Sequence, residues 1–164
     1  MIVRPRVATD LDALEPIAEE SHRLDGYPVR GEIDMRAFIE SAGALAAWVA
    51  CDVDGAVIGN VVLNERSSPA VMAHAAEVLG HDRIAVVARL LVARSARRSG
   101  VAAALLRMAA DDARARGLHP ILDVVATSAG PRALYEREGW RDVGTVTAVF
   151  SDGFSIDETV YVAP

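Results

Sequence analysis

The pattern of hydrophobic and polar positions along the chain switches between the period of a strand and the period of a helix. Alternating or continuously apolar stretches predict strands over residues 2–7, 45–53, 56–64, 84–93, 121–126, 143–150 and 155–162. Apolar residues spaced three or four apart predict helices over residues 10–24, 34–41, 100–116 and 131–138, and residues 71–79 are also compatible with a helix. The order of these segments predicts an α/β (α+β) mixed sheet of about seven strands, flanked by about four helices.

Turn signals and one apolar segment indicate the strand directions. Asp54-Gly55 and Asp152-Gly153 each lie between two strand segments, and Asp-Gly favours tight antiparallel hairpins. The segment from Ile84 to Ala93 is almost entirely apolar, which is typical of a central strand covered on both faces. A helix separates this strand from the next, as a parallel connection requires. We therefore expect an antiparallel N-terminal part and parallel fourth and fifth strands.

Length, composition and charge favour a single folded domain over residues 1–164. Hydrophobic residues make up 52% of the 164 positions and charged residues 24%, as in ordinary globular domains. The formal net charge is −6, and all 17 basic residues are arginines. An acidic domain of this kind lacks the basic face that binds nucleic acid. We expect no nucleic-acid partner.

Cysteine usage and the N-terminal sequence bear on cellular context. The single cysteine, Cys51, lies in an apolar stretch and is expected to be buried, so no disulfide and no cysteine-cluster zinc site are predicted. No metal is expected. The N-terminus lacks the apolar stretch of a signal peptide, and no apolar run approaches the ~20 residues that span a bilayer. We expect a cytoplasmic protein without a membrane partner; a homodimer stays open.

The connection between the fourth strand and the following helix has the features of an anion site. Three arginines, Arg94, Arg97 and Arg98, precede Gly100, and the first helical turn after it contains only small or apolar residues. Helix N-termini expose unpaired N–H groups and attract anions, and glycine permits close approach. The alternative is a plain connection with solvated arginines. A dinucleotide fold and a P-loop are not supported, because G-x-G-x-x-G and a Walker lysine are absent.

Two segments resemble motifs of the GNAT N-acetyltransferase superfamily. Arg97-Arg98-Ser99-Gly100-Val101-Ala102 resembles the family's Arg/Gln-x-x-Gly-x-Gly/Ala signature, and Ala133 to Trp140 resembles its Leu-Tyr-x-x-x-Gly-Phe/Trp segment. The order of the motifs and one intervening strand agree with the family, and the resemblance covers essentially the whole chain. It implies a GNAT-like fold and an acyltransferase that uses acetyl-CoA as co-substrate.

The resemblance also implies site residues. The pantetheine arm would bond to the backbone edge of the fourth strand, and the pyrophosphate would rest on the helix start. Tyr135 is implied as the acid that protonates the CoA thiolate, since a phenol with a pKa near 10 stays protonated. The implied cofactor-binding residues are Leu90, Leu91, Val92, Arg97, Arg98, Ser99, Gly100, Val101, Ala102, Ala103, Ser128 and Tyr135.

The sequence does not identify one residue as the general base. Many family members carry a glutamate on the fourth strand, where this chain has none. Asp123 on the next strand is a substitute, or an anchor for the substrate amine. Three further carboxylates border the segments that could form the acceptor pocket: Glu32, Asp34 and Glu65. The four histidines, which are expected to be surface or loop residues, are His22, His74, His81 and His119.

Three departures from the family pattern affect the cofactor contacts. Ser128 stands where asparagine is frequent, Pro131 where alanine is common, and Arg94 replaces the usual proline after the fourth strand. The leading hypothesis is transfer of an acetyl group from acetyl-CoA to an amine of a small molecule. A non-catalytic acyl-CoA-binding or sensing domain and a protein amine acetyltransferase are the alternatives.

Overall fold

A computed structural model describes residues 1–30 and 33–164 of the chain. Over these residues the strands are β1 (Ile2–Pro5), β2 (Ala44–Cys51), β3 (Val57–Asn64), β4 (Ile84–Val92), β5 (His119–Val125), β6 (Arg141–Val149) and β7 (Ser155–Val162). The α-helices are α1 (Leu11–Asp25), α2 (Met35–Glu40), α3 (Pro69–Leu79), α4 (Val101–Ala115) and α5 (Ala129–Arg137), and short 3₁₀ helices cover Ala8–Asp10 and Arg94–Ala96.

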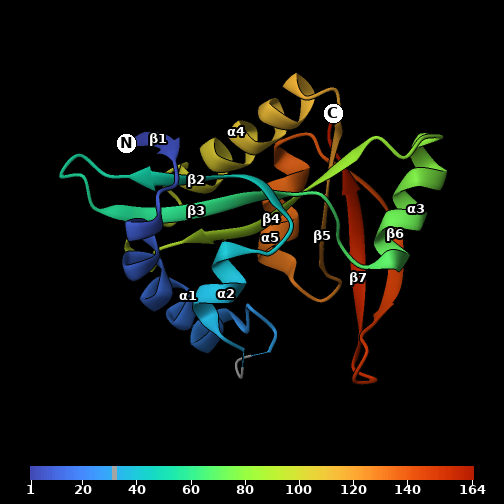
Figure 1. Cartoon of the computed structure of the whole chain (residues 1–164), viewed down its shortest axis with the longest axis horizontal. Helices are drawn as coiled ribbons and strands as arrows, with labels where there is room; N and C mark the ends of the chain where they lie inside the picture. Colours follow the sequence, from blue (N-terminus) through green and yellow to red (C-terminus); the bar gives the residue numbers. More distant parts are fainter. Residues whose placement is uncertain (31–32) are drawn as a thin grey trace. The chain divides into compact units, whose positions relative to one another are not determined.

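The strands form one mixed sheet in the order β1-β2-β3-β4-β5-β7-β6 (Figure 1). β4 and β5 are parallel and the remaining pairs are antiparallel, so the expected fold class is confirmed. β6 and β7 form the last hairpin of the chain. Its second strand, β7, pairs with β5, so that β7 lies between β5 and β6. β5 begins at His119, two residues before its predicted start, since the His119 N–H donates to the Arg83 oxygen at 2.8 Å.

The chain folds into two compact units. Unit 1 comprises Met1–Asn64 and Val87–Asp111, and unit 2 comprises Glu65–Val86 and Asp112–Pro164. Both β4 and α4 contribute residues to each unit. The assignment of the whole chain to one domain stays a prediction.

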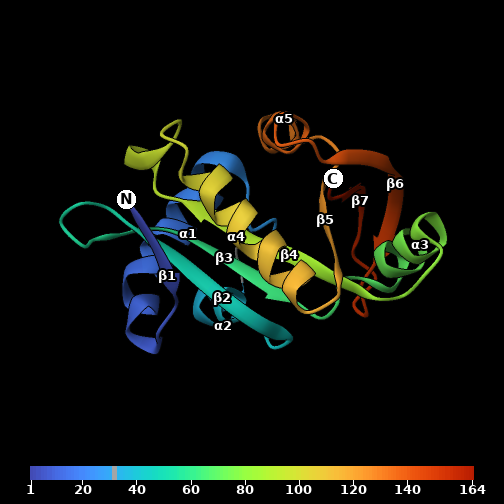
Figure 2. The same ribbon diagram turned by 90° about the horizontal axis from the view of Figure 1, so that it is seen from above.

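In unit 1, helices cover both faces of the strands. α1 and α2 lie on one face and α4 lies on the other (Figures 1 and 2). The core on the α1 side joins residues of α1, α2, β2 and β4: Leu11, Leu14, Ala18, Ile39, Val49, Cys51 and Leu91. Burial of Cys51 confirms the prediction made for this residue.

The opposite face of unit 1 allows a very close approach of α4 to β3. A Cβ atom added at Gly59 would lie 3.0 Å from both the Leu91 carbonyl oxygen and the Leu105 Cδ1, and 3.1 Å from the Val101 Cγ1. These distances are shorter than ordinary carbon contacts. The absence of a side chain at Gly59 therefore sets the distance between the strand and the first turns of α4.

In unit 2, α3 and α5 pack on opposite faces of the β5–β7–β6 strands. The α3 face carries a core of Val71, Ala75, Ile84, Val86, Ile121, Val160 and Val162. On the other face, the Tyr135 ring of α5 contacts the Tyr161 ring of β7. Among the described residues, no helix combines the length and apolar character needed to cross a membrane.

Replacing Gly59 by alanine tests the close seating of α4. We expect Gly59→Ala to lower the free energy of unfolding by about 1–3 kcal/mol, because the new methyl group overpacks a rigid contact. Gly43→Ala is the matched control, since its Cβ would meet nothing within 4 Å. Urea denaturation measures both variants. Equal stability of the two variants would contradict the proposed contact.

Candidate functional site

The turn between β4 and α4 presents backbone donors to solvent. After β4, the Ala93 N–H still donates to the Ile58 oxygen of β3 at 2.9 Å, and the chain then forms the 3₁₀ helix Arg94–Ala96. The Ser99 hydroxyl donates to the Ala96 oxygen at 2.6 Å and closes the turn. α4 starts at Val101, so its first N–H groups have no partners within the helix.

Left-handed backbone conformations shape this turn. The φ angles are +62° at Arg98 and +86° at Gly100, and both residues are exposed. A Cβ at Gly100 would meet nothing within 4 Å, so the space before α4 is open. Left-handed residues in a turn can direct neighbouring N–H groups toward one point, where an anion can bind. The residues expected to hold a pyrophosphate, Arg98 to Ala103, thus form an open N-terminal turn.

Arg97 has a protein partner. Its guanidinium donates two hydrogen bonds to the Asp25 carboxylate, at 2.5 and 3.1 Å, and this bond raises the pKa of Arg97. Asp25 is the last residue of α1, so the ion pair fastens α1 to the turn. Arg97 therefore has a structural role, and its predicted contact with a cofactor stays a prediction. Arg94 and Arg98 are exposed beside the turn.

β4 is irregular just before the turn. Arg89 has a φ of +54°, and its backbone oxygen accepts a hydrogen bond from the Asn60 amide at 2.9 Å. Its Nε donates to the Phe38 oxygen at 2.9 Å, and the guanidinium carbon lies 4.1 Å from the centre of the Phe38 ring. These contacts hold a conformation that a non-glycine residue adopts at a cost.

The edge of β4 that faces β5 forms few strand-to-strand pairs. Pairing with β5 covers Ile84–Val86 only, among the residues described. Leu90, Leu91 and Val92 lie beyond this stretch, with Leu91 buried in the core of unit 1 and the other two half-buried. Their position fits the predicted addition of an extended ligand to a strand edge.

Tyr135 is held firmly in unit 2. The side chain is only 8% exposed, and its ring centre lies 5.6 Å from that of Tyr161. The Tyr161 hydroxyl donates to Glu136 and accepts from the Arg132 Nε, both at 3.1 Å. Burial raises the pKa of Tyr161, and the Arg132 bond opposes this rise. Tyr135 therefore packs, largely buried, against a tyrosine whose own hydroxyl is hydrogen-bonded on both sides.

Asp123 forms a carboxyl pair with Glu158, which sequence reasoning missed. Asp123 pairs with Val160 and Val125 pairs with Glu158, so the two acids are diagonal neighbours on one face of the sheet. Burial raises the pKa of Glu158 to about 8, and the charge of Asp123 and a hydrogen bond with it add to this rise. The alternation along β7 could have revealed Glu158, because it shares a face with Val160 and Val162.

The carboxyl pair and Tyr135 lie on opposite faces of the β5–β7 strands. Tyr161, which contacts Tyr135, alternates along β7 with Val160, the partner of Asp123. Ser128 lies directly before α5, half-buried, and its N–H donates to the Val125 oxygen at 2.9 Å. The structure thus brings Asp123 together with Glu158, and Tyr135 together with Tyr161.

Other candidate carboxylates have different surroundings. Asp34 caps α2 by accepting a hydrogen bond from the Ala37 N–H at 3.1 Å, and Glu65 is exposed. Glu32 lies outside the described residues. Within residues 1–30 and 33–164, no group of three or more His, Cys, Asp or Glu side chains could hold a metal ion.

Comparisons with known proteins point to one family. The sequence model of the Acetyltransferase (GNAT) family matches residues 11–140. No curated protein matches the chain. Among solved structures, an N-acetyltransferase related to GCN5 from Kribbella flavida is similar, with a TM-score of 0.72, 23% identity and coverage of 99% of this chain and 96% of the other.

Two further structures have the same fold. One is ribosomal-protein-alanine N-acetyltransferase from Brucella melitensis, with a TM-score of 0.71, 22% identity and coverage of 99% and 98%. The other is Arabidopsis thaliana NAA60 in complex with acetyl-CoA, with a TM-score of 0.70, 22% identity and coverage of 98% and 97%. At these identities the likeness shows the fold alone.

The carboxyl pair predicts a stability that depends on pH. The folded state raises the pKa of Glu158 from 4.5 to about 8, so it binds a proton that the unfolded state lacks in this window. Stability is therefore lost as pH rises from 4.5 to 8. Since Gln cannot ionise, we expect Glu158→Gln to be more stable than the parent at pH 8 by about 1–2 kcal/mol, allowing for solvent screening, and nearly equal at pH 4.5.

Thermal unfolding at the two pH values measures this effect. A gain of about 2–4 °C per kcal/mol is expected at the higher pH. Glu77→Gln on the exposed surface of α3 is the control, and it should show no such dependence. A Glu158→Gln variant whose melting temperature follows that of the parent at every pH would contradict the raised pKa.

Proposed function

We propose that this chain, which belongs to the acetyltransferase (GNAT) family, moves the acetyl group of acetyl-CoA to an amine of a small molecule. Family membership makes the protein an N-acetyltransferase, which is an acyltransferase. The acceptor and the residue roles are the proposed part. The observation that carries the proposal is the open, left-handed turn before α4, which coincides with the family's signature segment.

Binding of CoA would use this turn and the edge of β4. The N–H groups from Arg98 to Ala103 suit a pyrophosphate, because they are unpaired at the positive end of a helix. The amides of the pantetheine arm would bond to the backbone of Leu90 to Val92. The acetyl-CoA bound to Arabidopsis NAA60, a protein of the same fold, supports acetyl-CoA as the co-substrate.

Acetyl transfer then needs two proton movements. The neutral amine nitrogen attacks the thioester carbonyl carbon, and a tetrahedral intermediate forms. The C–S bond breaks as this intermediate collapses, and the sulfur leaves with the electron pair. The Tyr135 phenol would donate its proton to that sulfur, and the amide product keeps the acetyl group. A fixed donor lowers the cost of expelling a thiolate whose ordinary thiol pKa is about 8.5.

The pair of Asp123 and Glu158 would take the proton that the attacking amine loses. Its two carboxyls share one proton at neutral pH, so the pair carries one negative charge and can attract an ammonium group. The acid and the pair act on different atoms, the sulfur and the nitrogen.

An acceptor screen tests the reaction. Release of free thiol from acetyl-CoA, with mass detection of acetylated products, is measured for small amines and for peptides. Acetylated small amines are expected. Acetylation of peptides alone would favour a protein acceptor, and binding of CoA without turnover would favour a sensing domain. The cytoplasmic location, the homodimer and the absence of a metal stay predictions.

Variants of Gly100 test the pyrophosphate site. We expect Gly100→Glu to abolish CoA binding, because it places a negative charge where the phosphates would lie. Gly100→Ala carries the same strain from the positive φ without the charge, and it should retain binding within about tenfold. Calorimetric titration with CoA measures both. Unchanged affinity in a folded Gly100→Glu protein would refute the site.

Replacing Tyr135 by phenylalanine tests the acid. The ring and its contact with Tyr161 remain, while the transferable proton is lost. We expect kcat to fall by about 10²–10⁴-fold and the affinity for CoA to change only a few-fold. The kinetics are measured with the acceptor that the screen identifies, together with a melting curve. Full kcat in Tyr135→Phe would remove this residue from the mechanism.

A further inference from the structure

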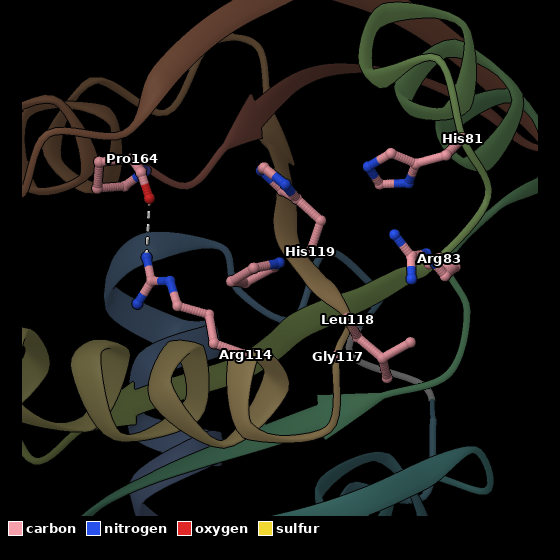
Figure 3. A pocket seen from close by; sticks show the side chains of 8 residues that line it. His81, Arg83, Arg114, Gly117, Leu118, His119 and Pro164 are labelled. Carbon is pink, nitrogen blue, oxygen red and sulfur yellow. Dashed lines mark hydrogen bonds between the residues drawn. The ribbon is translucent and has the colours of Figure 1, made fainter.

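Unit 2 contains a cavity of about 290 Å³ whose lining is basic and includes none of the residues assigned above to acetyl transfer (Figure 3). His81 and Arg83 come from the segment between α3 and β4, Arg114 from the end of α4, and His119 from the start of β5. Figure 3 shows His81 and Arg83 on one side of the cavity and Arg114, hydrogen-bonded to Pro164, on the other. None of the lining side chains, all within the described chain, is acidic.

The two histidines have buried polar atoms without partners. The His81 Nδ1 and the His119 Nε2 are buried and make no hydrogen bond with any described residue. Their ring centres are 6.0 Å apart. Both histidines line the cavity, so these nitrogens can bond to a polar molecule that enters it. The sequence predicted surface or loop histidines. His81 lies in the loop between α3 and β4, as predicted, whereas His119 is the first residue of β5.

The charges around the cavity indicate which kind of ligand it favours. No acidic side chain among the described residues forms an ion pair with Arg83, and the Arg114 Nη2 donates to the backbone oxygen of Pro164 at 3.0 Å. Burial lowers the pKa of His119, and the positive charges of His81, Arg114 and Arg141 lower it further. A hydrogen bond with the backbone of Ala163 acts in the opposite direction. An anion would relieve this repulsion, whereas a cation would add to it.

We propose that this cavity binds a phosphate-type oxyanion, either free or as the phosphate ester of a small molecule. Guanidinium groups bind such oxyanions through paired, charge-assisted hydrogen bonds, and protonated imidazoles donate further ones. The cavity volume of about 290 Å³ is just below the range for small-molecule sites, roughly 300–1,000 Å³. That volume accommodates a small phosphate ester.

NMR signals of the histidine rings test binding in the cavity itself. A phosphate bound at the start of α4 would not give the same result, because His81 and His119 line the cavity. Inorganic phosphate is added at constant ionic strength, and the ring signals of all four histidines are followed. We expect the signals of His81 and His119 to move with saturation. The signals of His22 and His74, whose rings bond to the Pro28 and Val143 oxygens, should stay fixed and serve as internal controls.

A pH titration in the presence of sulfate shows whether anion binding favours protonation of His119. Sulfate is suitable because it does not itself titrate in this range. A bound anion favours the protonated imidazole, so we expect the pKa of His119 to rise on binding. The charged groups that contribute to the titration of this ring are His81, Arg114 and Arg141, and Arg83 lines the same cavity. An unchanged pKa of His119 in sulfate would overturn the proposal.

A matched pair of arginine variants tests the site further. We expect Arg83→Gln to weaken phosphate binding by about tenfold or more, the value of one charge-assisted hydrogen bond. Arg137 is an exposed arginine on α5, and the Arg137→Gln variant should bind phosphate as the parent does.

Glycerol 3-phosphate distinguishes the two sources of the ligand, since tighter binding than inorganic phosphate indicates an ester. Equal losses in both variants, no movement of the two signals, or binding of Zn²⁺ in place of phosphate would overturn the proposal.

Discussion

The geometry of the turn before α4 depends on how closely that helix lies against β3. Gly59 allows the first turns of α4 to lie almost on the backbone of the strand, where a single methyl group would be too large. A helix placed further out would carry its unpaired N–H groups away from the end of β4. The strained residue Arg89 has a related role, because Asn60 and Phe38 hold it one residue before the β4 stretch Leu90 to Val92. Gly59 thus determines where the backbone N–H groups of α4 lie, and the left-handed Arg89 does the same for the backbone of β4. A side chain at another position could not supply these backbone groups.

Much of the fold could be predicted from the sequence because its signals are local. The Asp-Gly turns and the apolar segment of β4 identified strands whose bounds the structure moves by a few residues. The open turn before α4 could be located for the same reason, since its residues follow one another in the chain. The position of β7 between β5 and β6 was not predictable, because strand order depends on pairing between distant segments. The pair of Asp123 and Glu158 and the pair of Arg97 and Asp25 escaped prediction likewise, since each joins residues far apart in sequence.

The acidic composition of the chain conceals an uneven distribution of charge in unit 2. β5 begins at the basic cavity with His119 and reaches the carboxyl pair at Asp123, which is about 13 Å further along an extended strand. One strand therefore joins two surroundings of opposite sign. Burial is the main cause of both pKa shifts, and the neighbouring charges act in the same direction. The charge of Asp123 adds to the rise at Glu158, and the charges of His81, Arg114 and Arg141 add to the fall at His119. Net charge alone predicts neither behaviour.

The bond between Arg97 and Asp25 has a consequence for how such a protein can diversify. It fastens the end of α1 to the turn before α4, although 72 positions separate the two residues. The segment that follows α1 starts directly after this fixed point. A change of length or sequence in that segment therefore need not displace the turn, because Asp25 contacts Arg97 from the residue before the segment begins. Since an exposed ion pair contributes little to stability, the consequence of this one lies in where it places the end of α1.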